Sequence, residues 1–165
     1  MTLPRLSALI VTVFLANPAV CAETKAGSLE IEGARVGFMR PGQTNAAAFI
    51  EVENRGPQAD RLTGISFPKE VAQRGELHTM KHENGVMSMR EVQAFDIPSG
   101  GKLVLRPGSD HLMLIGVPKT LQPGQKIPMT LRFERAGEVT VSATVMDRPS
   151  HGSPGHDHNK DHGKR

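Results

Sequence analysis

The sequence has no tryptophan, no tyrosine and a single cysteine, Cys21. One cysteine cannot form an internal disulfide bond, so the hydrophobic core alone must stabilise the fold. The charge is also small, because 20 Lys and Arg against 17 Asp and Glu give a formal net charge of +3, spread along the chain. A nucleic-acid-binding protein needs a clustered basic face, so this class is disfavoured. The 165 residues, 38% of them hydrophobic, suit one domain.

The N-terminus has the pattern of an export signal. One basic residue, Arg5, precedes an apolar run over 6–16 and small residues up to Ala22. We expect residues 1–22 to be a signal peptide that is removed by cleavage. The run is shorter than the roughly 20 residues of a membrane-spanning helix, and the residues before Cys21 fit a lipoprotein signal poorly. Cleavage would leave no cysteine, so any metal would bind His, Met or carboxylate in an oxidising compartment.

Short β-prone segments follow, broken by Gly, Pro, Asn and Asp. Their spacing of about 8–12 residues predicts an all-β sandwich or barrel, and no segment has a sustained 3.6-residue period. Asn84-Gly85 predicts a tight hairpin turn, because this pair supplies two residues with positive φ. The predicted strands are 29–38, 46–53, 61–67, 75–80, 86–91, 102–105, 111–117, 127–134 and 138–145.

The composition changes sharply near the C-terminus. Residues 147–165 contain no side chain that can anchor a core, so we expect a disordered tail after a single domain at 23–146. Four of the seven histidines lie in this tail, with aspartates between them. Cu(II), Ni²⁺ and Zn²⁺ prefer such imidazole and carboxylate donors, and the alternative is a solvated linker. The candidate tail ligands are His151, His156, His158 and His162.

The predicted strand 111–117 presents a His and a Met together. Successive side chains in a strand point to opposite faces, so His111 and Met113 share one face. Leu112 and Leu114 occupy the other face, which we expect to face the core. The His and the Met are therefore at a separation that one metal ion can bridge.

The predicted hairpin upstream has a similar pattern. Glu76, His78 and Met80 alternate onto one face of its first strand, and Met87 and Met89 share a face of the returning strand. The Asn-Gly turn would place these two strands side by side. Two regions of the chain therefore each offer imidazole and thioether groups.

These ligand types select the metal. Thioether sulfur is soft and uncharged, so a set of two His and two Met suits Cu(I) above Zn²⁺ and disfavours Mg²⁺ and Ca²⁺. Without a thiolate the His₂Cys blue-copper site cannot form, which favours storage or delivery of copper over electron transfer. For any single side chain the alternative is an ordinary core Met or structural His. The grouping of these side chains within 36 residues favours a metal site.

The spacing also carries a family resemblance. His78 is followed by ten residues, Met89, twenty-one residues and then His111-Leu-Met113. This pattern resembles the H(M)-x10-M-x21-H-x-M signature of the PCuAC family of periplasmic copper chaperones. The flanking sequence is similar as well, including Gly-Val-Met-Ser-Met-Arg in the hairpin and Pro-Gly-Ser-Asp before His111. The similarity covers about 30–145, nearly the whole predicted domain.

The resemblance implies a cupredoxin-like Greek-key β-sandwich with an exposed Cu(I) site. Carried over by position, the ligands would be His78, Met89, His111 and Met113, with Met80 as a possible further ligand. It also implies delivery of Cu(I) to the copper centre of cytochrome c oxidase, directly or beside a Sco-type assembly protein. Some relatives hold Cu(II) in a His-rich tail, and we expect the same of the tail here.

Three functions therefore compete. The leading hypothesis is a periplasmic Cu(I) carrier, and the second is a periplasmic copper or zinc scavenger that works through the tail. The third is a β-sandwich interaction module without metal. An enzyme is not expected, because there is no cysteine nucleophile and Ser109-Asp110-His111 is too local for a hydrolytic triad. We expect a monomer that is not inserted in a membrane after signal cleavage.

Overall fold

The computed structural model describes residues 24–83 and 85–147, which form eleven strands and no helix. No helix within these ranges could cross a membrane. The predicted signal peptide and the predicted His-rich tail lie outside the described residues, apart from Asp147 at the start of the tail. The strands are β1 (Thr24–Ala26), β2 (Leu29–Val36), β3 (Asn45–Asn54), β4 (Asp60–Ser66), β5 (Arg74–Glu83), β6 (Val86–Val92), β7 (Phe95–Ile97), β8 (Lys102–Leu105), β9 (His111–Ile115), β10 (Lys126–Phe133) and β11 (Gly137–Val145).

All nine predicted strands are present, with some errors at their ends. β9 stops at Ile115 rather than at residue 117, because Gly116 adopts a φ of 68° that breaks the extended backbone. β5 extends to Glu83, three residues beyond its predicted end, because β6 pairs with it up to the turn. β1 and β7 were not predicted, since three residues are too few to show a period of two.

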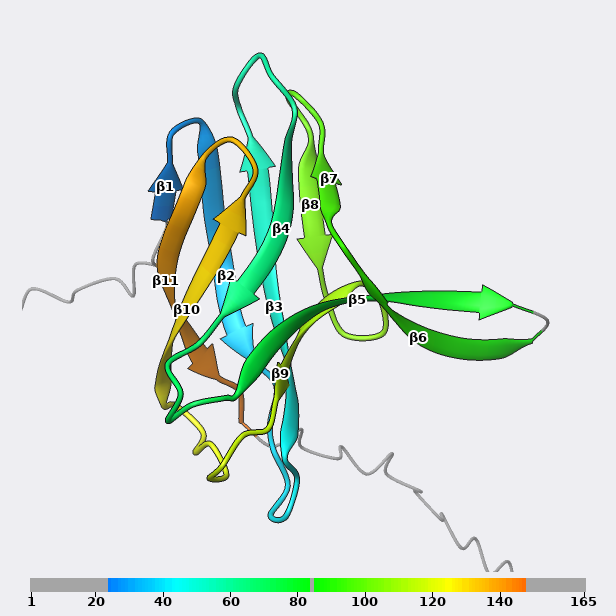
Figure 1. Ribbon diagram of the computed structural model, residues 1–165, viewed down its shortest axis with the longest axis vertical. Coiled ribbons are helices and arrows are strands. Elements are labelled where there is room, and N and C mark those ends of the chain that lie inside the picture. The colour runs from blue at the N-terminus through cyan, green and yellow to red at the C-terminus, as the bar shows by residue number, and fades with distance from the viewer. Residues whose placement is uncertain (1–23, 84, 148–165) are drawn as a thin grey trace, which may run out of the picture.

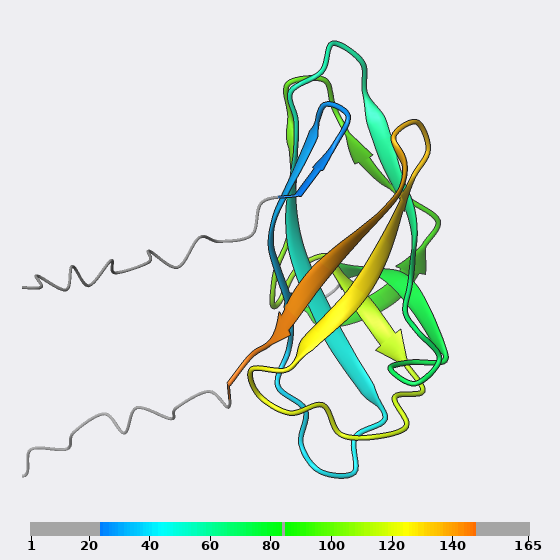
Figure 2. The same cartoon turned by 90° about the vertical axis from the view of Figure 1, so that its left-hand side faces the viewer.

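The strands form one continuous hydrogen-bonded sheet in the order β6-β5-β9-β3-β2-β11-β10-β4-β7. β1 pairs with β2, and β8 pairs with the second half of β3. Figures 1 and 2 show β2 and β3 on one side of the domain and β4 on the other, with β10 and β11 crossing between them. β3 and β4 follow each other in the chain but are separated by three strands in the sheet, which is a Greek-key connection.

The core lies between these layers and follows the predicted alternation. In β10, Ile127, Met129, Leu131 and Phe133 are all at most 2% exposed, and the residues between them point outward. Antiparallel pairing with β11 and β4 holds this strand in the centre of its layer. The domain therefore has one hydrophobic core, as the predicted all-β fold requires.

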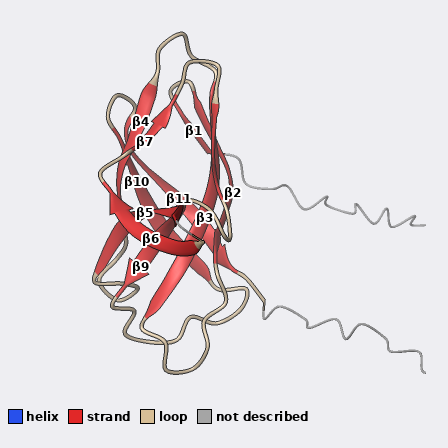
Figure 3. Cartoon of the chain, turned by 90° about the vertical axis from the view of Figure 1, so that its right-hand side faces the viewer, coloured by secondary structure: helices blue, strands red, loops and turns tan. Residues whose placement is uncertain are grey.

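The hairpin of β5 and β6 is the main departure from a closed sandwich. Only Arg74–His78 of β5 pairs with β9, and the rest of the strand continues away from the domain with β6. We call residues 79–83 and 85–90 the arm; it projects to the right in Figure 1 and towards the viewer in Figure 3. Gly85 has a φ of 79°, as expected of the predicted hairpin turn. The arm leaves both faces of its ribbon open near its tip.

Candidate metal centre

The register of three adjacent strands brings the predicted core-site residues to one face. β5 lies between β6 and β9 in the sheet. His78 is directly opposite His111 on β9, and Met80 is directly opposite Met89 on β6. Glu76 is opposite Met113. Because directly opposed residues of antiparallel strands point to the same side, this face carries both imidazoles and the thioethers.

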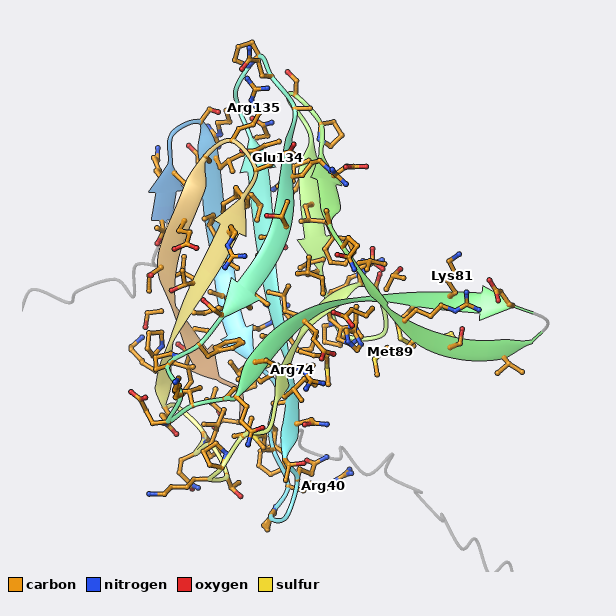
Figure 4. The ribbon with its side chains drawn as sticks, viewed as in Figure 1. Arg40, Arg74, Lys81, Met89, Glu134 and Arg135 are labelled. Atoms are coloured by element: carbon orange, nitrogen blue, oxygen red, sulfur yellow. The ribbon has the colours of Figure 1, made fainter. Side chains whose placement is uncertain are left out.

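The ring of His111 is fixed so that one nitrogen is available as a ligand. Its Nδ1 donates a hydrogen bond of 2.7 Å to the carbonyl oxygen of Ser109, which can only accept. In the neutral ring Nε2 therefore carries a lone pair, and it lies 3.1 Å from Sδ of Met89. His111 is only 7% exposed, whereas Met89 is 49% exposed at the base of the arm (Figure 4). Two electron-pair donors thus converge on one point at the surface.

The ring of His78 is held through the other nitrogen, Nε2, so that Nδ1 is left free. Its Nε2 donates to Oε2 of Glu76 at 2.8 Å, while its Nδ1 is buried and has no hydrogen-bond partner. Its ring centroid lies 5.8 Å from that of His111. A buried polar atom without a partner costs about 1–3 kcal/mol, so this nitrogen is suited to a ligand that the protein itself does not supply.

Glu76 holds His78 in this tautomer. Arg74 Nε donates to Glu76 Oε1 at 2.6 Å, and this bond, together with the one from His78, holds the pKa of the Glu76 carboxyl below its ordinary value. The group is therefore an ionised carboxylate that accepts from both neighbours. Sequence reasoning placed Glu76 on this face but gave it no role. The alternating spacing of Arg74, Glu76 and His78 on one strand was the signal that could have indicated one.

The remaining thioethers differ in exposure. Met80 and Met113 are partly buried, and Met87, further along the arm, is 53% exposed. Within residues 24–83 and 85–147, no group of three or more His, Cys, Asp and Glu residues is placed to hold a metal ion. At the base of the arm, the imidazole nitrogen of His111 and the neutral sulfur of Met89 are the donors that approach each other, and this pair suits a soft ion. The four candidate histidines of the tail lie outside the described residues.

Fold and site together define a cupredoxin-like domain with a cluster of imidazole and thioether groups at one end of its sheet, in which Met89 is exposed and His111 is buried. The chain belongs to the LpqE-like family, which matches residues 29–145. A relative from Leifsonia xyli subsp. xyli, named "Putative lipoprotein Lxx21020", is 36% identical over 107 residues. The match covers 64% of this chain and 63% of the relative, so it spans less than two thirds of the relative's length.

Solved structures with the same fold include a copper-bound domain. The copper-bound PCuAC domain from PmoF2 is 27% identical, with a TM-score of 0.64 over 77% of this chain and 99% of that domain. The apo PCuAC domain from PmoF1 is 26% identical, with a TM-score of 0.65 over 78% and 100%. Apo-DR1885 from Deinococcus radiodurans is 28% identical, with a TM-score of 0.58 over 87% and 95%. The predicted cupredoxin-like fold is confirmed.

Proposed function

We propose that this protein is a periplasmic copper chaperone that binds Cu(I) through His78, Met89, His111 and Met113. One observation carries the proposal: Nε2 of His111 and Sδ of Met89 approach to 3.1 Å, and the ring of His78 lies 5.8 Å from that of His111 between centroids. Support comes from solved neighbours whose names include a copper-bound PCuAC domain and Cu(I)-DR1885. Two imidazoles and two thioethers form a soft, uncharged set that suits Cu(I).

The geometry of the site suits an ion at this point. In tetrahedral zinc sites, bonds of about 2.0 Å to nitrogen and about 2.3 Å to sulfur place two such donors about 3.5 Å apart, and we take this spacing as the guide for Cu(I). The separation of His111 Nε2 and Met89 Sδ is 3.1 Å, so a small outward shift of the exposed Met89 side chain would admit the ion. His78 would bind through Nδ1 and His111 through Nε2. Met80, opposite Met89, is available as a further thioether.

Exposure of the site explains transfer. An acceptor's ligands can replace Met89 first, because this side chain is 49% exposed, while the buried His111 keeps its bond until later. We propose the copper-centre subunit of cytochrome c oxidase, or a Sco-type assembly protein, as the acceptor, and a monomeric donor. No catalytic step is proposed, since moving the ion needs only ligand exchange.

The His-rich tail is the second part of the proposal. His151, His156, His158 and His162 would hold Cu(II) beside the Cu(I) site. The alternative is a copper or zinc scavenger that works mainly through this tail. Truncation after Val145 separates the two: we expect the truncated protein to keep one tightly bound Cu(I) and to lose Cu(II). The measurement is anaerobic Cu(I) and aerobic Cu(II) titration against a competing chelator, with the full mature chain as control.

Either result of that truncation decides between the candidates. Retention of one Cu(I) supports the carrier, because the strand residues then suffice. Loss of tight Cu(I) binding on truncation would overturn the carrier in favour of the scavenger, provided that thermal unfolding shows the shortened chain still folded.

Glu76→Gln tests how the site is held. The amide cannot act as a charged acceptor for His78 and Arg74, so we expect Cu(I) affinity to fall about 10–100-fold, as for other partners of metal-bound histidines. Glu138→Gln is the matched control, because it breaks an Arg–Glu pair of 3.1 Å on another strand. Competition titration measures both. Equal affinities in the two variants would show that the Glu76 carboxylate does not position the ligand.

Export is also part of the proposal. We propose cleavage after Ala22 and release into the periplasm, whereas the lipoprotein name of the Leifsonia relative supports the alternative of a lipid on Cys21. The intact mass of the protein recovered from the cell envelope distinguishes them. A mass equal to residues 23–165 is expected. If the mass instead corresponds to a chain that begins at Cys21 and carries acyl groups, the proposal of release into the periplasm is wrong and the chaperone is anchored to a membrane.

A further inference from the structure

The two faces of the arm differ sharply in chemistry. On one face Glu83 pairs with Arg90 at 3.1 Å and with Lys81 at 3.9 Å, and all three side chains are at least half exposed. Figure 4 shows Lys81 on the outer half of the arm and Met89 at its base. The other face carries Met80, Met87 and Met89, and the strand register places His82 opposite Met87. One face is thus a solvated ion-pair surface, and the other carries three thioethers.

The three thioethers are close enough to share an ion. Met80 and Met89 are directly opposite, which places their Cβ atoms about 4.5–5.5 Å apart. Met87 lies two residues beyond Met89 on the same strand and diagonal to Met80, about 7–8 Å away between Cα atoms. The methionine side chain is long and unbranched, so its sulfur can cover these distances.

The exposure of these thioethers calls for a function. Met87 is 53% exposed and Met89 is 49% exposed, so neither side chain is placed as core packing. Val86, on the opposite face at the tip, is 65% exposed. The site described above uses Met89 but leaves Met87 without a role. Neutral thioethers that are open to solvent bind soft monovalent cations. They do not favour hard cations or anions, because their sulfur is soft and carries no charge.

We propose that Met80, Met87 and Met89 form an outer site for Cu(I), which shares Met89 with the inner site of His78, His111 and Met113. That the ion bound here is Cu(I) rests on the proposed function, whereas the existence of a thioether site does not depend on it. Met87 and Met89 are about half exposed, whereas His111 of the inner site is buried, so the outer site binds more weakly and exchanges faster than the inner one. Because Met89 belongs to both sites, an ion can pass between them by exchanging one ligand at a time, without release to water. The arm is therefore the route by which Cu(I) enters and leaves.

The test uses Ag(I), a redox-stable probe of Cu(I) sites, and protein labelled with ¹³C at the methionine methyl groups. We expect the first equivalent of Ag(I) to shift the methyl signals of Met89 and Met113. A second, weaker event should then shift those of Met80 and Met87. Three methionines serve as internal references: Met39 and Met129 are at most 1% exposed in the core, and Met146 is 37% exposed away from the arm.

Met87→Leu should abolish the second event and leave the first within two-fold in affinity, because this exposed side chain does not support the core. Met146→Leu is the matched control and should change neither event. The proposal is overturned if the Met80 and Met87 signals do not move beyond the Met146 reference, or if Met87 moves together with Met113 in the first event. Shifts of Met80 and Met87 without any of Met113 would support the outer site and overturn the proposed inner site.

Discussion

Replacing Met89 by Leu is expected to lower the affinity for Cu(I) at least about 100-fold. Leu keeps nearly the volume of Met but has no electron pair to donate, so the variant removes one ligand and little else. Partners that only orient a ligand cost 10–100-fold when mutated, and a direct ligand should cost at least as much. Since Met89 is 49% exposed, the free energy of unfolding should change by less than about 1.5 kcal/mol.

The measurement is competition titration with Cu(I) under anaerobic conditions, together with denaturant unfolding of the apo protein. Met146→Leu is the control, because it makes the same chemical change on an exposed methionine that follows β11. An affinity of Met89→Leu equal to that of the control would remove Met89 from the ligand set. The close approach of its sulfur to His111 would then be a packing contact only.

The second large effect is a loss of stability, and it is expected at Leu112, which is adjacent in the chain to two proposed ligands. Leu112 lies between His111 and Met113, but its side chain is fully buried on the opposite face of β9. Leu112→Ala should therefore destabilise the apo protein by about 2–5 kcal/mol through lost burial and the cavity left behind. The fraction that stays folded should bind Cu(I) within a few-fold of the parent affinity, because no donor has been removed.

Denaturant unfolding and Cu(I) titration on the same preparations check this separation. Val104→Ala is the control for stability, since it also shortens a strand side chain, but one that is 39% exposed. A Leu112→Ala variant as stable as the control would contradict the assignment of the two faces of β9. Strong loss of Cu(I) affinity in the folded fraction would show that the core side also shapes the site.

Local sequence was sufficient for the strands and for the sides on which their residues lie. The alternation in His111-Leu-Met-Leu-Ile placed the leucines in the core and the His and Met on the other face, and the structure agrees. The Asn-Gly pair predicted the β5–β6 hairpin, and the resulting register pairs Met80 with Met89. These features follow from side-chain period and turn geometry within a few residues, so they can be read without tertiary information.

Other features depend on contacts that no local pattern encodes. The pairing of β5 with β9 joins His78 to His111 across 32 intervening residues. Which strands become neighbours is decided by the burial of apolar faces over the whole sheet rather than by the strands alone. The projection of the arm also follows from this pairing, because β9 runs alongside only the first half of β5.

The sequence by itself therefore determined the fold class and the imidazole and thioether groups that make up the candidate donors of this face. Only the tertiary structure decided that His111 offers Nε2 and His78 offers Nδ1, because each choice depends on what the other ring nitrogen contacts. A carbonyl two residues before His111 and a carboxylate two residues before His78 hold these tautomers. Their positions are set by backbone conformation and by Arg74, so the spacing of Arg74, Glu76 and His78 can suggest a contact between them but not which ring nitrogen stays free.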